Sequence, residues 1–409
     1  MKNKIALTLP IWLRSVGGVL ANTNATRILS SNQQPKILIC NYLKAFGFVG
    51  EGKHPLGELT QWTDLLTALA LQDFQIYYAH DLQELVNDIL PYHSLDSFHV
   101  IFTDYSALKM YFSRQLGVLR QKDRHVVLTQ KEEEFKCKLR VLDSFGTHAK
   151  YNAMDLTDMK SMDSYCCWNL NLKQYLTLQP SKIPDPVNQF LGTATPLDFE
   201  GSQHEDQSLQ KKRKNTSSGK YRALIWAKEV KYFDNVPSTY LEVISQKFEL
   251  ITTLEANEFH VLKQKFPNVA FTNLGILSRA QYVKTLRESA IYVGLGTPYI
   301  GPSSIEALAF GNVIFNPRIS PRKLSDMGKP TDEIYTSQSG YLESIGSPNV
   351  VTLNMHDTES IKQHVENVVM LLNQNHGYTP PYLPSEFTLQ SFFYRVYSIV
   401  NSYNFCGRD

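Results

Sequence analysis

The stretch YVGLGTPYIGPSSIEALAFGNVIFNP, residues 292–317, decides the predicted fold. It begins with an apolar run that is typical of a buried strand and continues into a loop rich in glycine and proline. A short helical pattern over residues 303–311 follows, and residues 312–317 form a second strand-like run. A strand, a loop, a helix and a strand in this order indicate a parallel sheet that is covered by helices.

The loop and the helix of this stretch are the first candidate binding site. Ser303 or Ser304 is the expected N-cap of the helix, and Gly311 is expected just after its end. Backbone N–H groups in such a place favour an anion such as a diphosphate, so we predict that Gly296 and Ser303 contact one. Glu306, in the first turn, either stabilises the helix N-terminus or accepts hydrogen bonds from both hydroxyls of a ribose. The glycines and prolines that precede the helix favour the second interpretation, in which Glu306 binds a ribose.

Three common nucleotide-binding motifs are absent from the sequence. No G-x-G-x-x-G follows the first strand of either half, which disfavours a nicotinamide enzyme, and there is no P-loop. There is also no D-x-D, the usual holder of a metal ion under a nucleotide-sugar diphosphate, so we predict no metal site. A leaving diphosphate then needs a protein cation. Lys329, after the last predicted strand, is the best-placed candidate, although most lysines are simply surface residues.

Strand and helix patterns alternate along most of the chain. Further predicted strands cover residues 36–40, 74–79, 98–105, 222–228, 249–253, 269–275 and 290–296. Further predicted helices begin near Glu58 or cover residues 81–90, 106–119, 238–248, 256–265, 278–289, 359–374 and 386–401. This alternation predicts an α/β protein with two Rossmann-like domains and a cleft between them.

The alternation breaks between residues 145 and 220, which we interpret as an irregular linker. Its charge run Lys211–Lys214 favours a solvated linker over a heparin or nucleic-acid patch. The predicted parts of the chain are an N-terminal segment (1–35), a first Rossmann-like domain with the linker (36–215), a second Rossmann-like domain (216–376) and a C-terminal helical segment that packs back on the first domain (377–409).

The charge balance and the cysteines exclude several classes of protein. The 409 residues hold 41 lysines and arginines against 39 aspartates and glutamates, which argues against a nucleic-acid binder. The five cysteines include no C-x-x-C pair, so neither a zinc ribbon nor a thioredoxin-like site is expected. Cys166 and Cys167 are adjacent and do not easily bridge each other. Cys40, Cys137 and Cys406 either pair or are buried thiols.

Two features of the sequence bear on the cellular compartment in which the protein is located. The N-x-[S/T] triplets at Asn24 and Asn215 permit a lumenal location without proving it. Residues 5–21 resemble a poor signal sequence, because Pro10 and Arg14 interrupt an apolar run that is short for a membrane span.

Glu58 stands in the stretch EGKHPLGELTQWTD, residues 51–64, where a predicted amphipathic helix begins. A carboxylate in this place is either a charge that stabilises the start of the helix or a group that does chemistry. The surrounding residues alone favour the first interpretation.

These segments together resemble the mannosyl-glycoprotein β-1,6-N-acetylglucosaminyltransferase family, N-acetylglucosaminyltransferase V. The resemblance runs in the same order over residues ~36–406. The matching stretches are PLGELTQWTDLLTAL (55–69), CKLRVLDSFGT (137–147), WNLNLKQY (168–175), LRESAIYVGLGTPYIGPSSIEALAFGNVIFNP (286–317), GKPT (328–331), YTSQ (335–338) and PPYLPSEFTLQ (380–390).

The resemblance implies a metal-independent, inverting glycosyltransferase of GT-B architecture, located in the Golgi. The implied donor is UDP-N-acetylglucosamine, bound by the second domain, and the implied acceptor is the α1,6-linked mannose of an N-glycan on a glycoprotein, bound by the first. Glu58 matches the catalytic base. The implied donor contacts include Glu306, Lys329 and Phe145, and Trp168 matches a tryptophan near the acceptor.

The sequence departs from the family pattern in two respects. Ile300 stands where an acidic residue is expected, which puts one donor contact in doubt. The membrane anchor and stem of the family, and its tail beyond Cys406, are not evident in the sequence. Two alternatives remain open: a GT-B transferase with another donor or acceptor, and a non-catalytic module that binds glycans or growth factors through Lys211–Lys214.

Overall fold

The computed structural model describes residues 34–42, 57–108, 134–147, 165–166, 170–180, 188–195, 218–297, 299–324, 333–375, 377, 379–402 and 405. The chain divides into Met1–Pro35 and Lys36–Asp409, and every element below belongs to the second unit. Trp168, Lys211–Lys214 and Lys329 lie outside the described residues.

The first sheet is entirely parallel in its pairings. Its strands, in the order in which they pair, are β2 (Gln75–Ala79), β1 (Lys36–Cys40), β3 (Val100–Thr103), β4 (Leu139–Leu142), β7 (Tyr175–Thr177) and β8 (Gln189–Phe190). The three strands predicted before residue 106 are confirmed. β4, β7 and β8 were not predicted, because runs this short carry too little periodicity to be recognised without their neighbours.

The helices of the first half follow the predicted places. α3 is Gly57–Leu71, and α4 (Leu82–Glu84) continues as a π-helix over Leu85–Ile89, which together confirm the helix predicted at 81–90. α5 (Tyr105–Ala107) starts the helix predicted at 106–119, whose remainder lies outside the described residues. Asp81 and Asp104 begin α4 and α5, each accepting a hydrogen bond from a backbone N–H of its helix.

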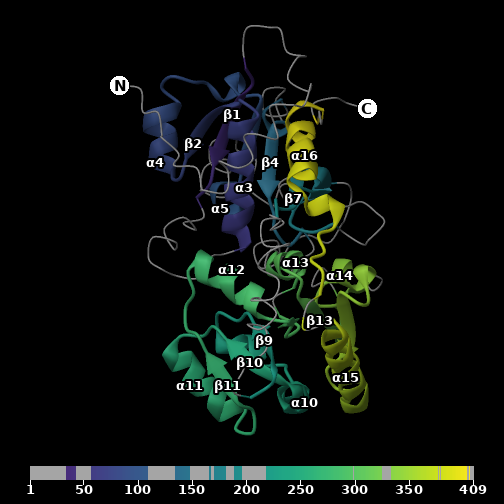
Figure 1. The fold of residues 1–409 in the computed structure, drawn as a ribbon. Helices are drawn as coiled ribbons and strands as arrows, with labels where there is room; N and C mark the ends of the chain where they lie inside the picture. Colours follow the sequence, from purple (N-terminus) through teal and green to yellow (C-terminus); the bar gives the residue numbers. More distant parts are fainter. Residues whose placement is uncertain are drawn as a thin grey trace. The chain divides into compact units, whose positions relative to one another are not determined.

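The C-terminal helix α16 (Leu389–Asn401) packs beside α3 on one face of the first sheet (Figure 1). Its buried residues Phe392, Val396 and Ile399 share an apolar cluster with Trp62 and Leu65 of α3. Two hydrogen bonds fix the contact: Gln72 Nε2 donates to the Phe393 carbonyl at 2.9 Å, and Arg395 Nε donates to the Leu191 carbonyl at 2.8 Å. The last helix therefore belongs to the core of the first sheet.

The second sheet has the strand order of a Rossmann fold. It pairs β11 (Phe271–Asn273), β10 (Phe248–Thr252), β9 (Tyr221–Ile225), β12 (Ile291–Val293), β13 (Val313–Leu324) and β15 (Val350–Asn354), all parallel, while β14 (Glu333–Ser337) runs antiparallel to the far part of β13. Counted along the chain, the parallel order is 3-2-1-4-5-6. The prediction that Lys329 follows the last strand is wrong, because β14 and β15 come after it.

The helices predicted in the second half are confirmed. They are α10 (Ser238–Lys247), α11 (Ala256–Lys265), α12 (Arg279–Glu288), α13 (Ser303–Ala309) and α15 (Thr358–Gln374), and the unpredicted α14 (Gly340–Ile345) is added to them. The remaining elements are a small ladder of β5 (Tyr165–Cys166) and β6 (Leu170–Asn171) and short 3-10 turns at Leu95–Ser97, Leu172–Gln174, Val230–Phe233 and Ser385–Phe387.

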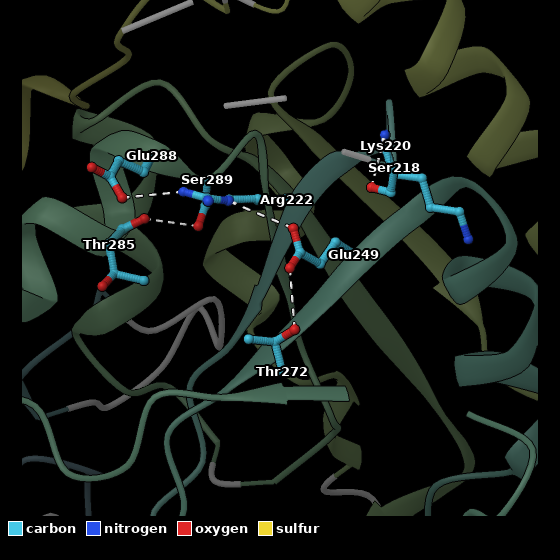
Figure 2. Close-up of polar contacts among 8 residues, drawn as sticks. All are labelled: Ser218, Lys220, Arg222, Glu249, Thr272, Thr285, Glu288 and Ser289. Carbon is cyan, nitrogen blue, oxygen red and sulfur yellow. Dashed lines mark hydrogen bonds and ion pairs between the residues drawn. The ribbon is translucent and has the colours of Figure 1, made fainter. Parts of the chain in front are cut away.

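Charged side chains near the amino ends of β9 and β10 are bound to one another (Figure 2). Arg222 forms ion pairs with Glu249 at 3.6 Å and with Glu288 at 3.2 Å, and Thr272 donates a hydrogen bond to Glu249 at 3.1 Å. This network joins three strands and the end of α12. Arg222 is thus neutralised by two carboxylates of the protein itself.

The structure settles the state of two of the three cysteines that were left open, whereas Cys406 lies outside the described residues. Cys40, on β1, is a buried free thiol, and burial raises its pKa. Cys137 is disulfide-bonded. A structural disulfide is typical of an oxidising compartment.

Candidate functional site

The candidate site lies where the strand order of each sheet reverses. In the first sheet this point is between β1 and β3, and in the second it is between β9 and β12. Parallel α/β sheets bind ligands outside the carboxyl ends of their strands at such points. Residues from both points line one cavity of about 440 Å³, among them Glu58, Asp104, Lys228 and Gly294.

The glycine-rich loop after β12 is held from the side by Gln338. Gln338 Oε1 accepts a hydrogen bond from the N–H of Gly296 at 2.9 Å, and its carbonyl accepts one from Ile300 at 3.2 Å. Gly296 itself does not line the cavity, although Leu295 and Thr297 do. The N–H that we predicted to meet an anion therefore donates to a glutamine side chain within the fold.

Gln179 connects the first sheet to this loop. It follows β7, is only 4% exposed and uses both ends of its amide. Nε2 donates to the Gly301 carbonyl at 3.1 Å, and Oε1 accepts from Ser339 Oγ at 2.7 Å. At the start of α3, a Cβ on Gly57 would lie 2.9 Å from Pro302 Cδ. The start of α3 therefore packs directly against the start of α13.

The start of α13 differs from its prediction. The N-cap is Pro302, which has no side-chain donor or acceptor, and Ser303 is the first helical residue. The Ser303 hydroxyl is hydrogen-bonded to the Tyr292 hydroxyl at 2.8 Å, so it is engaged by a strand residue and does not cap the helix. Gly311, with φ of +72°, ends the helix as predicted.

Glu306 is buried and forms an ion pair with Arg279, the first residue of α12. Its side chain is 8% exposed. A buried carboxylate is costly unless a cation and hydrogen bonds compensate it, so Arg279 neutralises Glu306 and fixes its orientation. Sequence reasoning missed Arg279, because nothing local indicates that a residue 27 positions away meets Glu306.

Five described carboxylates line the cavity, and four of them are bound to other groups of the fold. Asp104 caps α5, Asp143 accepts a hydrogen bond from Tyr105, Glu229 pairs with Lys231, and Glu306 pairs with Arg279. Among the residues that the structure describes, none forms a hydrogen bond or an ion pair with the Glu58 side chain. It lies in the first turn of α3, so its charge also favours the helix start.

The remaining predicted residues are placed as follows. Phe145, Ser303 and Ile300 line the same cavity as Glu58 and Glu306, whereas Trp168 and Lys329 are outside the described residues. Ile300 has φ of +45°, a left-handed backbone that β-branched residues rarely adopt. Such strained residues cluster at ligand sites.

Asp64 lies on α3, does not line the cavity and is 9% exposed. Burial raises the pKa of its carboxyl from 3.8 to about 8, with nearby Glu306 acting in the same direction. The N–H of Ala194, which donates to Oδ2 at 2.9 Å, and the charge of Arg279 lower the pKa but offset only part of the shift. The group is therefore largely protonated at neutral pH.

We expect the Asp64→Asn variant to gain stability over the parent as pH rises. Between the ordinary pKa of 3.8 and the folded value of about 8, Asp64 takes up a proton on folding, so rising pH opposes folding of the parent in that window. Asparagine keeps an acceptor for Ala194 and does not titrate. Thermal unfolding of both proteins from about pH 5 to 9 checks this. Melting temperatures that change in parallel with pH would contradict it.

The sequence matches a known protein family and several of its characterised members. The model of glycosyltransferase family 18 matches residues 12–409. The chain is 30% identical over 99% of its length to alpha-1,6-mannosylglycoprotein 6-beta-N-acetylglucosaminyltransferase A of Cricetulus griseus, covering 53% of that protein. It is 28% identical over 86% of its length to the human B enzyme, covering 42% of that protein. The chain thus spans about half the length of the curated relatives it matches.

Solved structures agree on the fold. The Anabaena protein HepE, solved with UDP and glucose, aligns with a TM-score of 0.51 at 9% identity, covering 90% of this chain and 100% of that one. At this identity the likeness shows the fold alone, the α/β GT-B architecture that was predicted. Within the described ranges, no helix has the length and apolarity to cross a membrane.

Proposed function

We propose, because this chain belongs to glycosyltransferase family 18, that it transfers N-acetylglucosamine from UDP-N-acetylglucosamine to an N-glycan. The acceptor atom is the 6-hydroxyl of the α1,6-linked mannose, and the new linkage is β. The printed names of the relatives support this donor sugar and this acceptor. The observation that carries the proposal is Glu58, a carboxylate with no hydrogen bond from any described residue, in a cavity at the switch points of both sheets.

The proposed reaction needs one base. The carboxylate of Glu58 takes the proton of the acceptor hydroxyl while its oxygen forms a bond to C1 of the donor sugar. On the opposite face of C1, the bond to the β-phosphate oxygen breaks, and its electron pair leaves with UDP. Inversion at C1 follows from this single displacement. The other cavity carboxylates are poor candidates for the base, because each is already bound to a donor or a cation.

The donor is proposed to lie against the second sheet and the acceptor against the first. Glu306, oriented by Arg279, accepts hydrogen bonds from the ribose, with Phe145, Ser303 and Lys329 as further donor contacts. Trp168 is proposed near the acceptor. We propose that the first domain covers residues 36–215 and the second domain residues 216–376. The segment 377–409 is proposed to return to the first domain.

Transfer assays with UDP-N-acetylglucosamine and a panel of N-glycans test the function. We expect product only with glycans that present an unsubstituted 6-hydroxyl on the α1,6-linked mannose. Transfer from another donor, or to another hydroxyl, would support the alternative GT-B transferase. Binding of UDP or glycan without turnover would support the non-catalytic alternative.

We expect Glu306→Gln to raise the donor KM by about tenfold and to leave kcat within about threefold. Contacts to the ribose are equally strong in the ground state and in the transition state, so their loss weakens binding without slowing the chemical step. Glu343→Gln is the matched control, because Glu343 pairs with Arg318 at 3.1 Å and does not line the cavity. A loss confined to kcat would contradict the ribose role.

We expect chelators to leave the transfer rate unchanged. The sequence has no D-x-D motif, and cationic side chains are present at the cavity to meet the diphosphate. The measurement is the initial rate after dialysis against EDTA, with and without added manganese. Activity that is lost in EDTA and restored by manganese would overturn metal independence.

A Golgi lumenal location is proposed on the same family basis. The disulfide at Cys137 supports an oxidising compartment.

A further inference from the structure

Lys228 is a cavity residue that the preceding assignments do not use. β9 ends at Ile225, so Lys228 lies in the loop beyond its carboxyl end, at the switch point of the second sheet. The cavity has two cations among its described lining residues, Lys228 and Arg279. Arg279 is bound to Glu306, whereas the Lys228 ammonium has no hydrogen bond or ion pair with any described residue.

No described residue binds the Lys228 ammonium through a hydrogen bond or an ion pair. Burial lowers the pKa of its ammonium, and the charges of Glu58 and Glu229 oppose that shift only in part. Glu229 is itself bound to Lys231. Lys228 therefore has three donor hydrogens that no described group accepts, in a place where an ammonium is disfavoured unless a counter-charge arrives.

The proposed reaction brings such a counter-charge to this place. When the bond from C1 to the β-phosphate oxygen breaks, negative charge grows on that phosphate and must be met by the protein. Glu58 acts on the hydroxyl that attacks C1, so the β-phosphate lies on the opposite side of the same carbon. Glu58 enters the cavity from α3 of the first half, and Lys228 enters the same cavity from the loop after β9 of the second sheet. The two side chains therefore line the space that holds the reacting centre from different sheets.

We propose that Lys228 binds the β-phosphate of the nucleotide-sugar donor and stabilises the leaving diphosphate. This assignment rests on the proposed glycosyl transfer, and it adds a catalytic residue from the second sheet that sequence reasoning did not identify. The competing role for Lys228 is to balance the charge of Glu58 without contacting the phosphate.

The test is calorimetric binding of UDP and of UMP to the parent and to Lys228→Gln. We expect UDP affinity to fall at least tenfold and UMP affinity to stay within about twofold, because UMP lacks the β-phosphate. Lys228→Arg, which keeps the charge, should recover part of the UDP affinity. Lys284→Gln is the matched control, because Lys284 is an exposed lysine of the same half that does not line the cavity.

The same substitution in a Glu58→Gln background distinguishes the two roles. If Lys228 contacts the phosphate, the Lys228→Gln substitution again lowers UDP affinity at least tenfold. If Lys228 only balances Glu58, the substitution has no further effect there and the proposal is wrong. Unchanged UDP affinity in Lys228→Gln, or equal losses for UDP and UMP, also overturns it. A parent protein that binds no UDP would instead contradict the proposed function.

Discussion

Glu58→Gln is expected to lower sugar transfer by about 10²–10⁴-fold, the usual cost of removing a general base. Glutamine has the size of glutamate and retains acceptor capacity, but it does not take up the proton of the attacking hydroxyl. UDP affinity should stay nearly intact, because the proposed donor contacts lie on other residues. The measurements are single-turnover transfer rates and calorimetric UDP binding. A variant that keeps more than about half of the parent rate would exclude Glu58 as the base.

A matched control separates the chemical role of Glu58 from its helical one. Glu359 is also an acidic residue in the first turn of its helix, α15, and its side chain is 83% exposed. Each glutamine substitution should cost a few tenths to about 1 kcal/mol of helix-terminus stabilisation. Glu359→Gln should therefore show a comparable change in the free energy of unfolding with full activity. Loss of activity in both variants would point to a general effect of folding.

Gly294→Ala is expected to have the second large effect, on the free energy of unfolding and on donor binding together. A Cβ at this position would lie 2.6 Å from Pro317 Cδ and 2.7 Å from the Phe315 carbonyl oxygen, and it would collide with Gln338 Oε1. The Phe315 carbonyl accepts the N–H of Gly294 at 2.9 Å, so it is held close and does not easily yield. Overpacking of this kind costs about 1–3 kcal/mol.

The displacement also reaches the site, because Gln338 holds Gly296 and Ile300 of the loop. We therefore expect weaker UDP binding in the folded fraction of Gly294→Ala. Gly301→Ala is the control for stability, since a Cβ there meets only Ser303 Oγ at 3.9 Å. Denaturant unfolding should place Gly301→Ala within about 0.5 kcal/mol of the parent. Equal stabilities for the two variants would refute the packing argument.

The fold class was predictable because it depends on local periodicity. The apolar run of β12, the amphipathic pattern of α3 and the Gly311 stop signal are each contained within a few consecutive residues, and all three appear in the structure. β4, β8 and β15 escaped prediction for the opposite reason. Each is a run of only two to five residues, and nothing within so short a run indicates which strands lie beside it.

Glu58 and Glu306 were singled out in the sequence because each stands at a helix start. At Glu58 the local pattern alone favoured a stabilising charge, so its role as base comes from the family resemblance and stays a proposal. Whether each of these carboxylates is paired with a cation was not predictable from the sequence. Which carboxylate is neutralised depends on Arg279, 27 residues from Glu306, and the contact between the two sheets depends on Gln179, 160 residues from Ser339. The amino acid at each position sets which charges and hydrogen-bonding groups exist. Only the tertiary structure decides which of them are satisfied within the protein, because pairing is a property of neighbours in space, and Glu58 and Lys228 are distinguished by lacking such partners among the described residues.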